Sequence, residues 1–170
     1  MNGGDAPAVA GISSSRFREV LGHFASGLTV VTSVDQDGPV GFTCQAFMSL
    51  SLEPPLIAIA PGKSSTTWPR IAPGGTFCVN MLSEDQEILC RDFAISGSEK
   101  ADKFSGVGWS PGPAGAPVLD GALAWVSCRI VQSHEAGDHE LVVGEVLDMS
   151  IDNSGRPLIF YRGGFGRFES

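Results

Sequence analysis

The chain has 170 residues, which suits one domain with a sizeable core, and its 42% hydrophobic and 18% charged content is typical of a globular protein. Its formal net charge of -8 argues against general attraction to nucleic acid or to anionic lipid. The longest apolar stretch, residues 56–61, is far too short to span a membrane.

The N-terminal residues are predicted to be a tail. Residues 1–15 lack the positive segment and the apolar core of a signal peptide. We therefore expect a flexible tail over residues 1–13, one domain over residues 14–170 and a location in the cytoplasm.

An amphipathic helix is predicted next, ending before Gly27. Four apolar residues recur there at helical spacing, namely Phe17, Val20, Leu21 and Phe24. Residues 28–34 and 39–45 are rich in β-branched side chains and flank the turn sequence DQDG, which predicts a hairpin. The apolar run of residues 55–61 is bounded by prolines and predicts a buried strand.

The middle of the chain alternates short helices and a strand. Residues 64–71 begin with good N-cap residues and predict one or two helical turns. Residues 75–82 predict a strand, and residues 83–93 predict a helix that starts with a capping box between Ser83 and Gln86.

Loop residues and then strands dominate the rest of the chain. Residues 96–117 are dense in Gly, Pro and Ser and are expected to form a lid or an interface segment. Three strands are predicted over residues 122–133, 139–151 and 157–165. The fold class is therefore mainly β: a closed antiparallel barrel with Greek-key links and a few short flanking helices, not a doubly wound parallel sheet.

The cysteines do not suggest a metal site. They are widely spaced, no CxxC motif occurs, and the histidines add no zinc-ligand spacing. We expect all four to be small buried apolar side chains, namely Cys44, Cys78, Cys90 and Cys128.

A cluster of hydroxyl residues beside a lysine, residues 63–67, follows the strand that ends at Pro61. It is not a P-loop, because Ile57 occupies the position where that motif needs glycine. Backbone N–H groups, hydroxyls and the charge of Lys63 would nevertheless suit a phosphate. An ordinary helix cap with a solvated lysine explains the cluster equally well.

Three other segments carry candidate residues. In GDH, residues 137–139, Asp138 is not expected to orient His139, because neighbours on a strand point to opposite faces. Residues 160–168 combine aromatics, arginines and glycines, which suits a planar anionic ligand, or equally a last strand with a dimer contact. Lys103 is expected to be a surface lysine.

With no paired carboxylates and no obvious nucleophile, a bound cofactor is expected to supply the reactivity.

Several motifs, spread from residue 17 to residue 165, together resemble the short-chain flavin reductases that serve two-component flavin-dependent monooxygenases. They occur in this order: GFTCQAFMSLSLEPPL, GKSSTTW, FCVNML, ADKFSG, LDGALAWVSC, GDHELVVGEV and PLIFYRGGF. The resemblance implies a split β-barrel that forms a homodimer, with flavin near the subunit interface. It also implies NADH-dependent reduction of FAD or FMN, which then diffuses to a separate monooxygenase.

The resemblance also implies site residues, and each is carried over from a matching motif. The isoalloxazine would lie beside Gly41, Phe42, Thr43, Gln45 and Ala46. The ribityl chain and phosphate would follow Ala60, Pro61, Gly62, Lys63, Thr66 and Thr67, with Phe93 as the aromatic after the next helix. The nicotinamide would be bordered by Tyr161, Arg162, Gly163 and His139, of which His139 is the candidate catalytic residue. Where the family commonly shows Arg-Phe, this chain has Arg-Asp-Phe at residues 91–93.

In this reading the protein holds two flat rings face to face, about 3 to 3.5 Å apart, and contributes no nucleophile. Two alternatives stay open. One is a related barrel that retains its flavin and oxidises a small substrate. The other is a flavin-binding protein without turnover.

Overall fold

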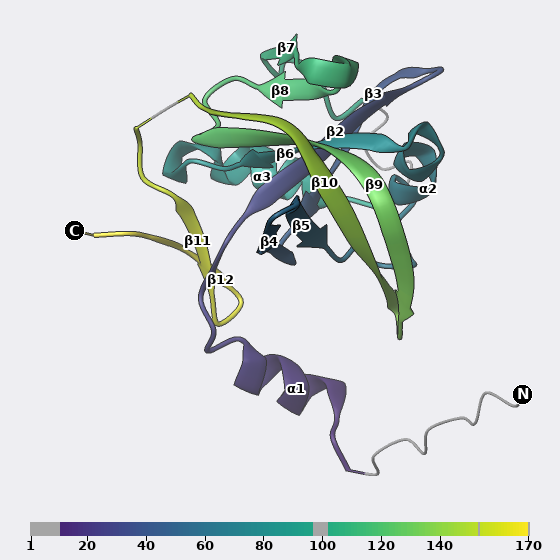
Figure 1. Ribbon diagram of the computed structural model, residues 1–170. Helices are drawn as coiled ribbons and strands as arrows, with labels where there is room; N and C mark the ends of the chain where they lie inside the picture. Colours follow the sequence, from purple (N-terminus) through teal and green to yellow (C-terminus); the bar gives the residue numbers. More distant parts are fainter. Residues whose placement is uncertain (1–10, 97–101, 153, 170) are drawn as a thin grey trace, which may run out of the picture.

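The computed structural model describes residues 11–96, 102–152 and 154–169 (Figure 1). Most of the tail expected over residues 1–13 lies outside these residues, as does part of the expected lid segment. Within the described residues, no helix has the length and apolar character needed to cross a membrane.

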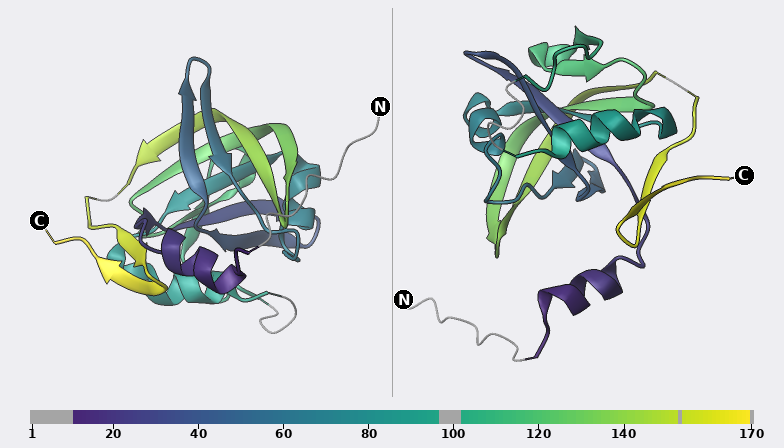
Figure 2. Two further views of the ribbon diagram at one scale, coloured as in Figure 1. Left: turned by 90° about the horizontal axis from the view of Figure 1, so that it is seen from below. Right: turned by 180° about the vertical axis from the view of Figure 1, so that it is seen from behind.

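A seven-stranded antiparallel sheet forms the body of the molecule, in the order β3-β2-β6-β9-β10-β5-β4. It curls into the barrel seen in Figures 1 and 2. Its strands are β2 (Thr29–Asp35), β3 (Gly38–Cys44), β4 (Phe47–Leu52), β5 (Pro55–Ile59), β6 (Thr76–Met81), β9 (Ala124–Ala136) and β10 (His139–Ile151). Since β6 pairs with β2 and not with β5, the chain crosses over as Greek-key links require. The predicted mainly β fold class is confirmed.

The predicted hairpin forms between β2 and β3, and its turn is closed by a hydrogen bond from Asp37 N to Asp35 Oδ1 at 2.8 Å. Gly38 ends the turn at φ 118°, a conformation that favours glycine. The side chains of β2 alternate between two buried clusters: Val31 packs in the main barrel core, and Val30 packs in the cluster that contains Phe93. The main core cluster also includes Phe77 and Val79 of β6.

The helices are short and lie outside the barrel. Figures 1 and 2 show α1 (Ser14–Leu21) standing away from the sheet. The others are α2 (Trp68–Ile71), α3 (Glu87–Ala94) and the 3-10 turns η1 (Ala72–Gly74), η2 (Glu84–Gln86) and η4 (Pro113–Gly115). The capping box between Ser83 and Gln86 is present, at the start of η2.

Two small sheets flank the barrel. One has the order β1-β11-β12 and the other pairs β7 with β8. Their strands are β1 (Ser26–Gly27), β11 (Leu158–Tyr161), β12 (Gly164–Arg167), β7 (Trp109–Pro111) and β8 (Pro117–Leu119). The turn between β11 and β12 has positive φ at Arg162 (50°) and Gly163 (79°).

All four cysteines are buried and unpaired by disulfides, as expected for small apolar side chains. Burial raises the pKa of Cys44 to about 11 and that of Cys78 and Cys128 to about 12. Their thiols therefore stay protonated near neutral pH. No cluster of metal-ligating side chains occurs among residues 11–96, 102–152 and 154–169.

Candidate flavin and nicotinamide site

A cavity of about 770 Å³ opens on one side of the barrel. Its walls come from the end of β3 and the start of β4, the end of β5 with the loop that follows, the C-terminal end of α3, and the first residues of β10. The volume lies within the range of small-molecule sites.

Most of the site residues expected from the sequence lie on this cavity, although they come from separate parts of the chain. Those that line it are Phe42, Thr43, Gln45, Ala46, Ala60, Pro61, Gly62, Thr66, Thr67, Phe93 and His139. The fold therefore gathers the two flavin segments and the candidate catalytic histidine around one space.

Tyr161, Arg162 and Gly163 do not line the cavity. They form the turn between β11 and β12, which contacts the end of α1. The N–H of Arg162 donates to Gly22 O at 2.9 Å, and the Tyr161 ring meets the His23 ring edge-on at 6.2 Å. Within one chain, this turn contacts the residues that follow α1 and does not line the cavity.

Gly41 lies behind the cavity wall. A Cβ at this position would approach Phe93 Cε1 to 2.8 Å and the carbonyl oxygen of Val31 to 3.1 Å. The missing side chain lets Phe93, itself fully buried, pack on β3. Gly41 therefore supports a lining residue and does not line the cavity itself.

Lys63 also does not line the cavity. Its ammonium group forms an ion pair with Glu135 of β9, and its backbone N–H donates to Asp138 O at 2.9 Å. Both contacts turn the residue toward the tip of the β9–β10 hairpin. The side chain is 42% exposed, so the pair is solvent-screened.

The hydroxyl residues after Lys63 cap a helix as well as lining the cavity. Ser65 Oγ accepts hydrogen bonds from the backbone N–H groups of Thr67 at 3.3 Å and Trp68 at 3.1 Å. Pro69 stands in the first turn of α2, where its missing N–H does no harm. The helix-cap explanation is therefore confirmed for Ser65, and phosphate binding by the cluster stays a prediction.

The expectation that Asp138 does not orient His139 is wrong. Asp138 Oδ1 lies 2.8 Å from His139 Nδ1. The expectation applied strand alternation to a residue that precedes the strand, since β10 begins at His139 and Gly137 has a turn conformation with φ 66°. The His139 hydrogen bond lowers the pKa of Asp138, which is therefore ionised at neutral pH.

Lys103 is a cavity residue that the sequence reading missed. It is half-buried, and its Nζ donates to Phe93 O at 2.9 Å and lies 3.5 Å from Gly41 O. No carboxylate of the described residues lines the cavity, in a protein whose net charge is -8. Nothing in the pattern around Lys103 distinguishes it from a surface lysine, because its position depends on contacts with β3 and α3.

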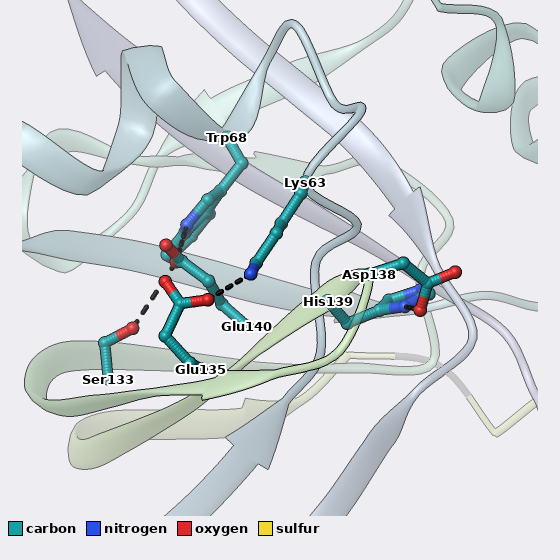
Figure 3. A network of polar contacts seen from close by, with 7 residues as sticks. All are labelled: Lys63, Trp68, Ser133, Glu135, Asp138, His139 and Glu140. Carbon is teal, nitrogen blue, oxygen red and sulfur yellow. Dashed lines mark hydrogen bonds and ion pairs between the residues drawn. The ribbon is translucent and has the colours of Figure 1, made fainter. Parts of the chain in front are cut away.

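Polar contacts join the end of β5 and the start of α2 to the tip of the β9–β10 hairpin (Figure 3). Trp68 Nε1 donates to Glu140 Oε2 at 2.7 Å, and Ser133 Oγ donates to the same oxygen at 3.4 Å. The backbone N–H of Glu140 also donates to Pro61 O at 3.0 Å. These contacts hold His139 against the wall that carries Gly62.

The chemistry of the cavity suits a flat, partly apolar ligand with an anionic end. Phe24, Phe42 and Phe47 offer aromatic surface, and Lys103 offers a positive charge. Cys44, the lining thiol, is kept protonated by burial. The described lining therefore provides donors and surface but no activated nucleophile.

Comparison with known proteins identifies the class. Residues 21–169 match the family model described as flavin reductase like domain, and the chain belongs to this family. The resemblance inferred from the motifs is thereby confirmed, and with it the flavin reductase class of oxidoreductases.

Named relatives agree with this assignment. The chain is 44% identical over 169 residues to the reductase subunit HsaB of a flavin-dependent monooxygenase from Rhodococcus jostii, covering 99% of this chain and 85% of the relative. It is 41% identical over 159 residues to the FMN reductase (NADH) SmoA of Agrobacterium fabrum, covering 94% and 88%. An NADH:FAD oxidoreductase of Streptomyces globisporus, solved with NAD and FAD fragments, superposes with a TM-score of 0.84 at 37% identity, covering 91% and 92%.

Proposed function

We propose that this protein reduces free flavin, FAD or FMN, with NADH. The observation that carries the proposal is the cavity, which combines aromatic surface, hydroxyls and one lysine with no lining carboxylate among the described residues. In the reaction NADH and a proton reduce one flavin, giving NAD⁺ and the two-electron-reduced flavin. Membership of the flavin reductase family and the NADH-dependent relatives support it.

The residues present fit a flavin. Thr43, Gln45 and Ala46 would border its ring system, and Thr66 and Thr67 would hold the phosphate end. Two of these side chains are held by hydrogen bonds: Thr43 Oγ1 donates to Cys90 O at 2.6 Å, and Gln45 Nε2 donates to Ser26 Oγ at 3.0 Å.

The chain's own residues would orient the nicotinamide. His139 stands at the cavity beside Gly62, with Nε2 3.6 Å from where a Cβ of Gly62 would lie. Its other ring nitrogen is held by Asp138, which fixes the orientation of the ring. We therefore place His139 at the nicotinamide side, as a residue that orients and not as a nucleophile.

A separate flavin-dependent monooxygenase would receive the reduced flavin. The support is the reductase subunit HsaB, a relative that is named as part of a flavin-dependent monooxygenase. Thr66, at the expected phosphate end, is exposed, and a solvated phosphate would let the product leave. The cytoplasm, where NADH is supplied, remains the predicted location.

We also propose a homodimer. The helix α1 has no buried residue in the single chain, and Phe17, Val20, Leu21 and Phe24 are 53% to 80% exposed. An apolar helical face of this kind is unstable in water unless a partner covers it. A second copy of the chain is the partner we propose, because α1 joins the β11–β12 turn whose residues were expected at the site.

The function is tested by mixing purified protein with NADH and each flavin and following NADH absorbance. We expect NADH consumption well above the rate with flavin alone, for FAD, FMN or both. No acceleration with either flavin would refute the proposal. Saturable flavin binding without NADH consumption would select a flavin-binding protein instead.

A further inference from the structure

Two polar bridges join the tip of the β9–β10 hairpin to the stretch from the loop after β5 to the first residue of α2 (Figure 3). One is the ion pair of Lys63 with Glu135, whose side chains are 42% and 77% exposed. The other is the hydrogen bond between Trp68 and Glu140, and the Trp68 side is buried, at 6% exposure. One bridge is exposed to solvent and the other is partly buried, so substitutions in each can show which of them matters for the site.

Alternation along β10 explains where Glu140 points. His139 and Leu141 line the cavity, whereas Val142 is fully buried in the barrel core together with Trp68. Glu140 shares the face of Val142, because side chains two apart on a strand point the same way. Its carboxylate therefore reaches the edge of the core, where the indole N–H meets it.

Trp68 in turn supports the cavity wall. Its ring packs edge-on against Phe42, which lines the cavity, at a centroid distance of 6.2 Å. Its backbone N–H donates to Ser65 Oγ at 3.1 Å, and Ser65 is another lining residue. A shift of the Trp68 indole would therefore displace both the Phe42 ring and the segment that contains Ser65.

We propose that Glu140 is a positioning residue: through Trp68 it fixes the wall that carries Ser65–Thr67 relative to the hairpin that carries His139. This rests on the proposed function, in which the two walls hold the flavin and the nicotinamide. Ring-to-ring transfer requires a separation near 3 to 3.5 Å, and a misplacement of about 1 Å can cost about 100-fold in rate. The charge-assisted hydrogen bond between Trp68 and Glu140 therefore determines how the flavin and the nicotinamide are placed relative to each other.

The test uses Glu140→Ala, which removes the acceptor, and Trp68→Phe, which removes the donor but keeps most of the ring. We expect each to lower kcat/KM for NADH by about tenfold, and the double variant to be no worse than either single one, because both break the same bond. Glu140→Gln keeps an acceptor oxygen and should stay within about threefold of the wild type.

A second readout needs no turnover. Titration of FMN against each variant, followed by quenching of flavin fluorescence, should give a dissociation constant raised by about threefold or more in Glu140→Ala, since the wall that carries Ser65–Thr67 has moved. The matched control is Glu135→Ala, which breaks the exposed bridge and should leave both kcat/KM and FMN affinity unchanged.

Two outcomes overturn the positioning role while leaving the proposed function intact. One is an active wild type in which Glu140→Ala melts at a lower temperature but keeps its kinetic constants and FMN affinity well below that temperature. The other is equal loss in Glu135→Ala and Glu140→Ala. A wild type that never consumes NADH with flavin refutes the proposed function instead.

Discussion

Lys63 and Lys103 lie in settings opposite to those suggested by their sequence contexts. Lys63 follows a strand end and precedes hydroxyls, yet its ammonium group pairs with Glu135 outside the cavity. Lys103 stands in an unremarkable loop, yet it lines the cavity and donates to Phe93 O. The local sequence around Lys63 suits an anion site, but which lysine reaches the cavity depends on contacts between elements far apart in the sequence.

We expect Lys103→Met to raise the dissociation constant for FMN by about 10- to 150-fold, the effect of losing one charge-assisted contact of about 1.5 to 3 kcal/mol. Riboflavin, which lacks the phosphate, should lose much less. The measurement is quenching of flavin fluorescence for both ligands. Equal losses for the two would show that Lys103 only anchors its loop, and a larger effect for Lys63→Met would return the phosphate contact to Lys63.

Gly41 is sensitive for a packing reason. We expect Gly41→Ala to destabilise the protein by about 1 to 3 kcal/mol, because the new Cβ would overlap the buried Phe93 ring. FMN affinity should also fall, since Phe93 lines the cavity. Thermal unfolding and flavin titration check both effects. The control is Gly74→Ala, where no atom lies within 4 Å of the added Cβ, and an equal loss there would contradict the explanation.

Among the elements, strands followed their sequence patterns more closely than helices and turns did. The β-branched run of β2 and the apolar run of β5 form strands where expected, as does the segment of β6, because burial reinforces their strand propensity. The N-terminal helix stops at Leu21, before Phe24. The N–H groups of His23 and Phe24 donate to carbonyls three residues back and not four, and the His23 ring bonds to the carbonyl of Glu19. Asp138 was misjudged because it lies in the turn before β10, where the alternation of side chains along a strand does not apply.

The short helix α2 is fastened to the β2–β3 hairpin by an ion pair. Arg70 Nε lies 2.7 Å from Asp35 Oδ2. The hydrogen bond from Arg70 lowers the pKa of Asp35 below its ordinary value of 3.8 and raises the pKa of Arg70. The folded state therefore favours the carboxylate, and this stabilisation is fully present above about pH 4 to 5.

We expect the stability difference between the wild type and Asp35→Asn to be constant near neutral pH and to shrink as pH falls through the lowered pKa of Asp35. Denaturant unfolding at a series of pH values from 7 downward measures it. Asp37→Asn is the control, because its carboxylate lies 4.0 Å from Arg70 and is 72% exposed. A difference that grew in acid would contradict the assignment.

For the whole molecule, the sequence predicted the fold class and most cavity residues but not the arrangement of strands. The order β3-β2-β6-β9-β10-β5-β4 depends on pairings between segments far apart, such as β6 with β9, which local periodicity does not encode. The family resemblance predicted that Phe42, Thr66 and His139 belong to the site, and all three line the cavity. It also predicted Tyr161 and Arg162, which contact the residues after α1 and do not line the cavity of the single chain.

The exposed face of α1 leads to a prediction about assembly. We expect the wild type to sediment as a dimer and Phe17→Glu with Val20→Glu to sediment as a monomer, since burial of these side chains drives association. Val34→Glu, at an exposed apolar position on β2, is the control and should stay dimeric. A monomeric wild type would refute the homodimer.

The most direct test of the account is the number of flavins reduced per protein molecule when NADH and FAD or FMN are both in excess and oxygen is absent. The loss of oxidised flavin absorbance measures it. We predict that many flavins are reduced per protein, because flavin binds, is reduced and leaves. Reduction that stops at one flavin per chain, or that does not occur, would contradict the account.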